Sequence, residues 1–334
     1  MTQPLDTVAD APVQPRPFDS SGAEASSASV LRQINLAHGR LEQVLFNLDA
    51  AALPQQQIVD IARCVAAAAD RNLDVALACI LLNQGEGSYA VRHCVDSALV
   101  ALLVGRVLGL GSAHLLSVMA AALTMNVGML QLHEQLQRRL NGISDTELAA
   151  IRAHPQQSVA LLQRAGIDDP DWLTYVLLHH ENEDGSGYPF GRLSADIPLG
   201  AKLVALADRY CARVSTRSYR RSLLPCEALN DILLADHASV DPMLSACFIR
   251  VLGIYPTGAL VRLQSGEIGV VCGKGVSGST PLVHVLAGAD GNPLPEPLRR
   301  DSADSRYAVR EMLSEEEAGV RFRMHQIWGD AARR

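Results

Sequence analysis

The chain has 334 residues, of which 48% are hydrophobic and 19% charged, so it can fold around a substantial core as one large domain with one or two small ones. Its formal net charge of −7 and the lack of any basic run argue against a nucleic acid polymer as a partner. Seven cysteines are scattered without a CxxC pair, which indicates reduced thiols in the cytoplasm.

The N-terminal segment is polar and rich in proline. Residues 1–28 contain four prolines and a run of serine and alanine, without the basic start and apolar centre of a signal peptide, so we expect a disordered tail. Helical periodicity then runs from Val30 to about Asn83 with a break at Pro54. This pattern predicts an N-terminal helical region over residues 29–84, whose expected role is packing or dimerisation.

A series of helices is predicted from Tyr89 to about Ile232. The apolar stretch Leu115–Leu132 is short for a membrane crossing and contains several polar residues, so we predict a buried core helix and no membrane span. In chain order the predicted helices are one headed by His93, an apolar one over Leu115–Leu130, one opened by the capping box Ser144 and Glu147 that carries His154, one over Trp172–His180, and one opened by Pro198 that holds Asp208.

The pattern changes after about Phe248. Ala259–Leu263 and Ile268–Cys272 are short strand-like runs separated by a glycine-containing turn, which predicts a β-hairpin. Pro281–Leu286 and a turn at Asp290 indicate further strand. The predicted fold is therefore mainly α, with a small β appendix and a polar C-terminal tail in residues 246–334.

Histidines and one aspartate carry the chemistry that the sequence suggests. His179 and His180 directly precede a glycine-rich loop, Asp208 lies downstream, and His93 and His154 lie upstream on separate predicted helices. Imidazoles and carboxylates that meet inside a helical bundle are typical of di-metal hydrolases, in which the metals activate water and stabilise a phosphoryl group. A single histidine of this kind is most often an ordinary core or capping residue, so only the combination is informative.

The segment 179–191, which reads HHENEDGSGYPFG, resembles the signature loop of the HD-GYP family. The stretch 197–208 and the segment Arg217–Arg220 continue the similarity, which covers residues from about 89 to 234. The resemblance implies an HD-domain-like helical bundle over residues 85–245. It also implies hydrolysis of cyclic di-GMP by a bimetallic centre of iron or manganese.

The resemblance also implies roles for particular residues. Arg217, Arg220 and Lys202 are expected to bind substrate phosphates, because guanidinium and ammonium groups suit them. The residues expected to ligate metal are His93, His154, His179, His180 and Asp208. The residues of the loop that names the family are Asp184, Gly185, Gly187, Tyr188 and Pro189.

The His-Asp pair of the family is replaced in this sequence. Alignment on Gly128 places Met125 where the histidine belongs, Asn126 where the aspartate belongs, and Met129 where a lysine usually follows. An amide is neutral and cannot bridge two cations as a carboxylate does, and a thioether suits copper(I) better than iron or manganese. We therefore expect a degenerate site that holds one divalent ion (iron or manganese) or none, with a working bimetallic centre as the alternative.

Three functions stay open at this stage. The first is a catalytically silent module that binds cyclic di-GMP. The second is a docking module whose exposed loop, Asp184–Gly191, presents Tyr188 as an anchor to a diguanylate-cyclase-type protein. The third is an active cyclic di-GMP phosphodiesterase. We expect the protein in the cytoplasm, and its oligomeric state does not follow from the sequence.

Overall fold

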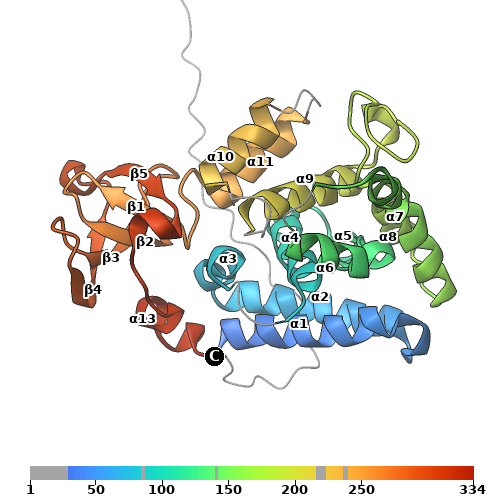
Figure 1. Ribbon diagram of the computed structural model, residues 1–334, viewed down its shortest axis with the longest axis horizontal. Helices are drawn as coiled ribbons and strands as arrows, with labels where there is room; N and C mark the ends of the chain where they lie inside the picture. The colour runs from blue at the N-terminus through green and yellow to red at the C-terminus, as the bar shows by residue number, and fades with distance from the viewer. Residues whose placement is uncertain (1–28, 84–86, 140–141, 216–222, 236–239) are drawn as a thin grey trace, which may run out of the picture.

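The computed structural model of the protein describes residues 29–83, 87–139, 142–215, 223–235 and 240–334, and the predicted tail at 1–28 lies outside these ranges. The predicted fold class is confirmed, because a large helical part carries a small antiparallel sheet at its C-terminal side (Figure 1). The α-helices are α1 (Val30–Phe46), α2 (Pro54–Arg71), α3 (Leu73–Leu82), α4 (Tyr89–Val107), α5 (Ser112–Thr124), α6 (Leu130–Arg138), α7 (Asp145–Arg164), α8 (Pro170–Leu178), α9 (Leu199–Val214), α10 (Pro225–Asn230), α11 (Pro242–Leu252), α12 (Glu315–Ala318) and α13 (Met324–Trp328). The strands are β1 (Leu260–Leu263), β2 (Ile268–Gly273), β3 (Leu282–Ala287), β4 (Pro293–Asp301) and β5 (Val309–Leu313).

The first three helices form one side of the helical part (Figure 1). Leu53 adopts a left-handed backbone conformation directly before Pro54, which opens α2 at a position where proline is favoured because its missing N–H needs no partner. The predicted break at Pro54 is thus confirmed. A further break, which the periodicity did not indicate, occurs at Asn72, whose side chain accepts a hydrogen bond from the Val75 N–H and caps α3.

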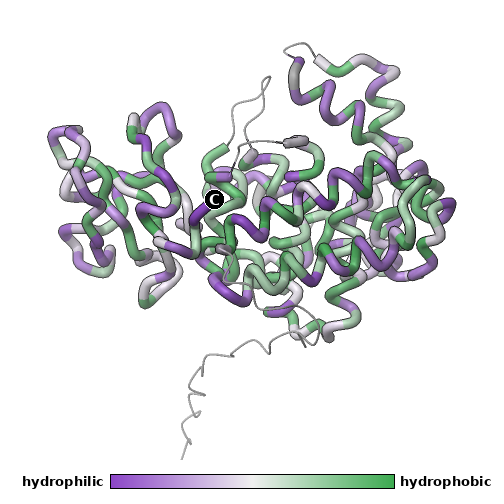
Figure 2. The backbone as a smooth tube through the Cα atoms, turned by 90° about the horizontal axis from the view of Figure 1, so that it is seen from below, coloured by the Kyte–Doolittle hydropathy of each residue, from purple (hydrophilic) through white to green (hydrophobic). Residues whose placement is uncertain are grey.

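Helix α4 lies at the centre of the helical part. Sixteen of its nineteen residues are buried, and it packs against α5, α9 and α11. Gly105 makes this packing close, because a Cβ atom there would lie only 2.5 Å from the Leu115 side chain. The peripheral helices alternate between hydrophobic and hydrophilic residues along the tube in Figure 2, as expected for helices with one buried face.

The predicted helix Leu115–Leu130 is interrupted in the structure. Helix α5 ends at Thr124, a 3₁₀ turn covers Val127–Met129, and α6 begins at Leu130. Ser158 of α7 stabilises the interruption, because its hydroxyl donates to the Met125 carbonyl at 2.8 Å and accepts from the Gly128 N–H at 2.9 Å. A contact with a distant helix therefore replaces the local hydrogen bonds that a continuous helix would make.

Among the described residues, one helical segment, Ser112–Gln137, is long and apolar enough to span a membrane by length and composition. Within its most apolar stretch, 67% of the residues are buried inside the protein. The Trp172 indole of α8 donates to the Thr124 hydroxyl at 2.7 Å, so the segment is also bonded to its helical neighbours. These contacts are those of a core helix, as the sequence predicted.

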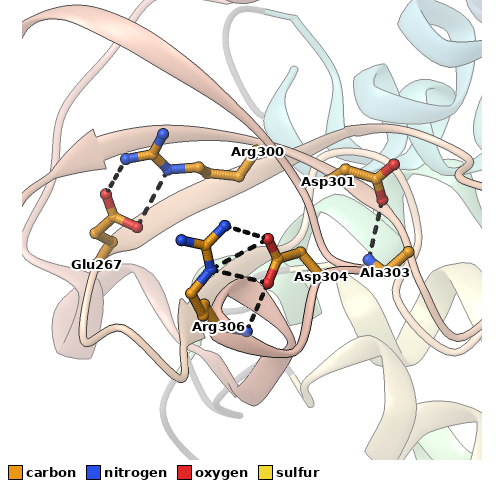
Figure 3. A network of polar contacts seen from close by, with 6 residues as sticks. All are labelled: Glu267, Arg300, Asp301, Ala303, Asp304 and Arg306. Carbon is orange, nitrogen blue, oxygen red and sulfur yellow. Dashed lines mark hydrogen bonds and ion pairs between the residues drawn. The ribbon is translucent and has the colours of Figure 1, made fainter.

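The C-terminal strands form one antiparallel sheet in the order β4-β3-β2-β1-β5. The predicted hairpin is β1 and β2, paired with Leu260 opposite Val270. Ion pairs lie on the charged surface of the sheet and its loops, among them Glu267 with Arg300 and Asp304 with Arg306 (Figure 3). Strand β4 is exposed and contains three prolines, which is tolerated because it lies at the edge of the sheet.

The sheet and the chain end pack closely on the helical part. Gly258 and Gly273 let the sheet approach α3, since a Cβ atom at Gly258 would lie 3.1 Å from Ala78 and one at Gly273 would lie 3.0 Å from the Asp74 carboxylate. The last residues return to α1, where Ala332 joins the main core. The predicted domain boundary at 245/246 falls inside α11, whose Phe248 is fully buried in the helical core.

Candidate functional site

The five predicted metal ligands come from four helices and meet in one place. His93 lies in the first turns of α4, His154 in the middle of α7, His179 and His180 at the end of α8, and Asp208 in α9. Burial by itself would raise the pKa of Asp208, but its hydrogen bond and charge interaction with His93, together with the nearby His180 and His179, hold that pKa well below the usual value. The structure divides these side chains into two groups.

The first group is formed by His154, His179 and His180, whose potential ligand nitrogens all lie within 4.8 Å of one another. We call it the three-histidine set. The ring Nδ1 of His154 lies 2.6 Å from the Ile151 carbonyl oxygen, and that of His179 lies 2.7 Å from the Val176 carbonyl oxygen. A carbonyl oxygen only accepts, so this network assigns the ring proton to Nδ1 in both residues and leaves a lone pair on each Nε2.

Those two lone pairs face each other. The Nε2 atoms of His154 and His179 are 3.2 Å apart. Burial and the neighbouring His179 lower the pKa of His154 to about 3, and burial also lowers the pKa of His179, so neither ring is protonated on Nε2 near neutral pH. Two ligands at about 2.1 Å from a tetrahedral ion lie about 3.4 Å apart, so the spacing of these two nitrogens suits a divalent ion such as iron, manganese or zinc.

The second group is a closed pair. His93 Nε2 lies 2.6 Å from Asp208 Oδ1, and both residues are buried, with 2% and 8% of their surface exposed. Aromatic rings surround His93, since Tyr89 stacks on it and His133 meets it edge-on with a centroid distance of 5.5 Å. His133 was not among the predicted site residues, and nothing in its local sequence marks it, because its neighbour on α4 is distant in the chain.

The segment aligned with the family's His-Asp pair lies between these groups. Met125 is fully buried, and Asn126 is 1% exposed and interacts with the Cys94 thiol next to His93. Neither amide atom of Asn126 has a hydrogen-bond partner of normal geometry among the described residues, and a thiol is only a weak partner. Gly128 holds the segment against α7, because a Cβ atom there would lie 2.9 Å from the His154 carbonyl oxygen.

The glycine-rich loop folds back over the histidines. The buried Glu181 carboxylate accepts hydrogen bonds from the backbone N–H groups of Phe190 at 2.7 Å and Arg192 at 2.9 Å. Gly187 lies directly on the backbone of residues 180–182, where a Cβ atom would come within 2.3 Å of Asn182 N. Only glycine permits this approach, which is why the loop closes where it does.

Tyr188 differs from our expectation. We predicted an exposed anchor, but its ring stacks on His180 with a centroid distance of 4.7 Å, and burial raises its pKa well above the ordinary tyrosine value. The aromatic side chain that the loop does expose is Phe190, which is 51% exposed and lies under the Arg192 guanidinium. The stacking depends on a residue eight positions earlier, so the loop sequence alone did not reveal it.

Comparison with known proteins finds relatives of the helical part of the chain. The HD domain family model matches residues 81–244. The chain is similar to cyclic di-GMP phosphodiesterase PA4108 of Pseudomonas aeruginosa, with 31% identity over 210 residues that cover 62% of this chain and 50% of that protein. It is also similar to cyclic di-GMP phosphodiesterase PdeB of Borreliella burgdorferi, with 23% identity over 181 residues that cover 54% of this chain and 48% of that protein.

A solved structure shares the fold. Bd1817, described as an HDG"Y"P protein from Bdellovibrio bacteriovorus, superposes with a TM-score of 0.54 at 16% identity and covers 70% of this chain and 74% of that chain. Residues 81–244 form an HD domain of the HD-GYP type. The chain spans about half the length of these two curated relatives.

Of the three predicted phosphate-binding residues, Lys202 lies in the described part of the chain. Arg217 and Arg220 lie outside the described residues. A hollow lies beside the three-histidine set, and Lys202 does not line it. The Lys202 ammonium lies instead 3.4 Å from the Glu183 carboxylate and 2.8 Å from the Ser194 hydroxyl. These contacts give it a role in bracing the loop that begins at Glu181.

The hollow next to the three-histidine set has a volume of about 350 Å³. Tyr188 forms one wall, and the cations of the hollow are Arg152 from α7 and Arg209 from α9. Sequence reasoning missed both arginines. The sequence did hold one signal for them, which is that both arginines lie next to predicted metal ligands: Arg152 precedes His154 by two residues, and Arg209 directly follows Asp208.

Proposed function

We propose that this is a cyclic di-GMP-related signalling protein of the cytoplasm, whose HD-GYP domain holds one divalent ion and binds the nucleotide without efficient hydrolysis. The observation that carries the proposal is the division of the five potential metal ligands into two groups. The three-histidine set offers three potential ligands for one ion. His93 and Asp208 bond to each other instead, and the buried Asn126 belongs to the segment between the two groups. The similarity to cyclic di-GMP phosphodiesterases supports the choice of nucleotide.

The chain's own residues define what this site does. His154 and His179 would hold a divalent ion through Nε2, because each Nδ1 is bonded to a backbone carbonyl, and the Tyr188 ring stacks on His180. A bound divalent ion supplies Lewis acidity toward a phosphoryl oxygen. The neutral Asn126 amide adds no negative charge with which to hold a second ion, and losing one metal's contribution to the transition state removes about 4 kcal/mol, on the order of a thousandfold in rate.

Two measurements test the proposal together. Calorimetry of the metal-loaded protein with cyclic di-GMP is expected to show binding, and a turnover assay with added iron(II) or manganese(II) is expected to show little linear product. Sustained hydrolysis would establish the alternative, an active cyclic di-GMP phosphodiesterase. The absence of binding heat would remove the nucleotide-binding function.

A second candidate function is docking onto a diguanylate-cyclase-type protein. It is supported by the exposed apolar side chains at the tip of the glycine-rich loop, where Phe190 is 51% and Leu193 is 59% exposed. We expect Phe190→Ser to weaken binding of a purified diguanylate-cyclase domain, and Tyr188→Phe, which keeps the inward-stacked ring, to leave it unchanged. Equal binding by both variants would rule out this docking surface.

A further inference from the structure

The hollow beside the three-histidine set has a strongly unbalanced charge. Arg152 and Arg209 line it, and no carboxylate does so among the described residues. This excess stands out in a chain whose formal net charge is −7. A concave site with two guanidinium groups and no acid attracts an anion.

Arg152 is the more available of the two cations. It is exposed, and within the described part of the chain its side chain makes no hydrogen bond or ion pair. Arg164, on the same helix, forms a two-pronged ion pair with Asp49 instead, at 2.9 and 2.7 Å. Arg152 faces the hollow, close enough to Tyr188 that its charge acts on the phenol.

Arg209 enters from the other side. It lies on α9 next to Asp208 and lines the same hollow, whereas Arg152 comes from α7. Burial and the nearby His179 contribute most to the low pKa of His180, and the charge of Arg209 lowers it further, so Arg209 is close to the three-histidine set. Arg152 and Arg209 therefore line one hollow together with His179 and His180.

We propose that Arg152 and Arg209 clamp one phosphoryl group of a nucleotide over the three-histidine set. This deepens the proposed function and rests on it for the nucleotide. Guanidinium groups bind phosphate oxygens through two parallel N–H donors, which gives both affinity and orientation. A volume of about 350 Å³ is at the lower end for small-molecule sites, so one nucleotide half enters and the rest of a dinucleotide stays outside.

The experiment is titration calorimetry of the metal-loaded full chain with three probes: cyclic di-GMP, the linear dinucleotide with a terminal phosphate, and inorganic phosphate. We compare the wild-type chain with Arg152→Gln, Arg152→Lys and Arg209→Gln. The matched control is Arg310→Gln, which removes one exposed charge from β5 on the opposite side of the molecule (Figure 1). Metal content and thermal unfolding are measured for every variant.

Each Arg→Gln change at the hollow is expected to weaken binding at least tenfold, with an intermediate loss for Arg152→Lys and none for the control. Unchanged affinity in Arg152→Gln at normal metal content would overturn the clamp, while binding of cyclic di-GMP by the wild type would leave the proposed function standing. Phosphate binding that depends on Arg152, without binding of either dinucleotide, would keep the clamp and remove the nucleotide. The Arg152 variants decide the matter if Arg209→Gln fails to fold, because Arg152 is exposed.

Discussion

Substitution of His93 distinguishes the stabilising role of the His93–Asp208 pair from metal binding by the three-histidine set. In His93→Ala the Asp208 carboxylate, which belongs to a residue only 8% exposed in the native packing, loses its 2.6 Å partner. Leaving one charge of a buried pair uncompensated costs about 3–5 kcal/mol. That is a large part of the 5–15 kcal/mol by which a typical domain is stable, so we expect a strongly destabilised but folded protein.

Urea unfolding of the chelator-treated chain measures this cost for His93→Ala, Asp208→Ala and the double variant. Because removing both partners leaves no unpaired charge, we expect the double variant to lose much less than the sum of the single changes. Metal content after reloading is measured in parallel, with His154→Ala as the contrast. We expect His93→Ala to keep its ion and His154→Ala to lose it; additive energies, or loss of the ion from His93→Ala, would refute the division of the site into two groups.

Three further changes test other parts of the structure. Burial raises the pKa of Asp96 to about 8, whereas an unfolded aspartate loses its proton near pH 4, so the wild type loses stability as pH rises from about 4 to 8. Asp96→Asn carries no group that titrates in this range and should therefore gain about 2–4 kcal/mol over the wild type between pH 4.5 and 7. Urea unfolding that gives the same pH slope for both proteins would contradict this. Ser158→Ala leaves the Met125 carbonyl and the Gly128 N–H without their partner and should lower the free energy of unfolding by about 1–3 kcal/mol; a neutral effect in the same assay would show that the turn does not depend on this hydroxyl. Met125→His combined with Asn126→Asp should raise the metal content from one ion per chain to two, and elemental analysis that matches the parent would show that the alignment on Gly128 is wrong.

Local patterns in the sequence predicted much of the fold. The capping box at Ser144 and Glu147 opens α7 in the structure, and Pro198 precedes α9 as expected. These signals succeed because they concern hydrogen bonds and backbone angles within a few residues. Strand β4 was harder to recognise, because its alternating prolines read as a breaker and are tolerated only at a sheet edge.

The site was predicted in its residue types and missed in its contacts. The pairing of His93 with Asp208 and the inward direction of Tyr188 depend on helices that meet only in the folded chain. Arg152 looked like an ordinary exposed residue, since nothing in a helical pattern distinguishes an arginine that faces a hollow from one that faces solvent. The break after Thr124 likewise depends on Ser158, a residue more than thirty positions away.

The most direct test of the central claim is the number of metal ions bound per chain after reconstitution with excess iron(II) or manganese(II) and removal of free metal. A complete three-histidine set beside a closed His93–Asp208 pair predicts one ion per chain. Two ions per chain would contradict this division of the site, and a chain that binds none would contradict the assignment of the three-histidine set as a metal centre.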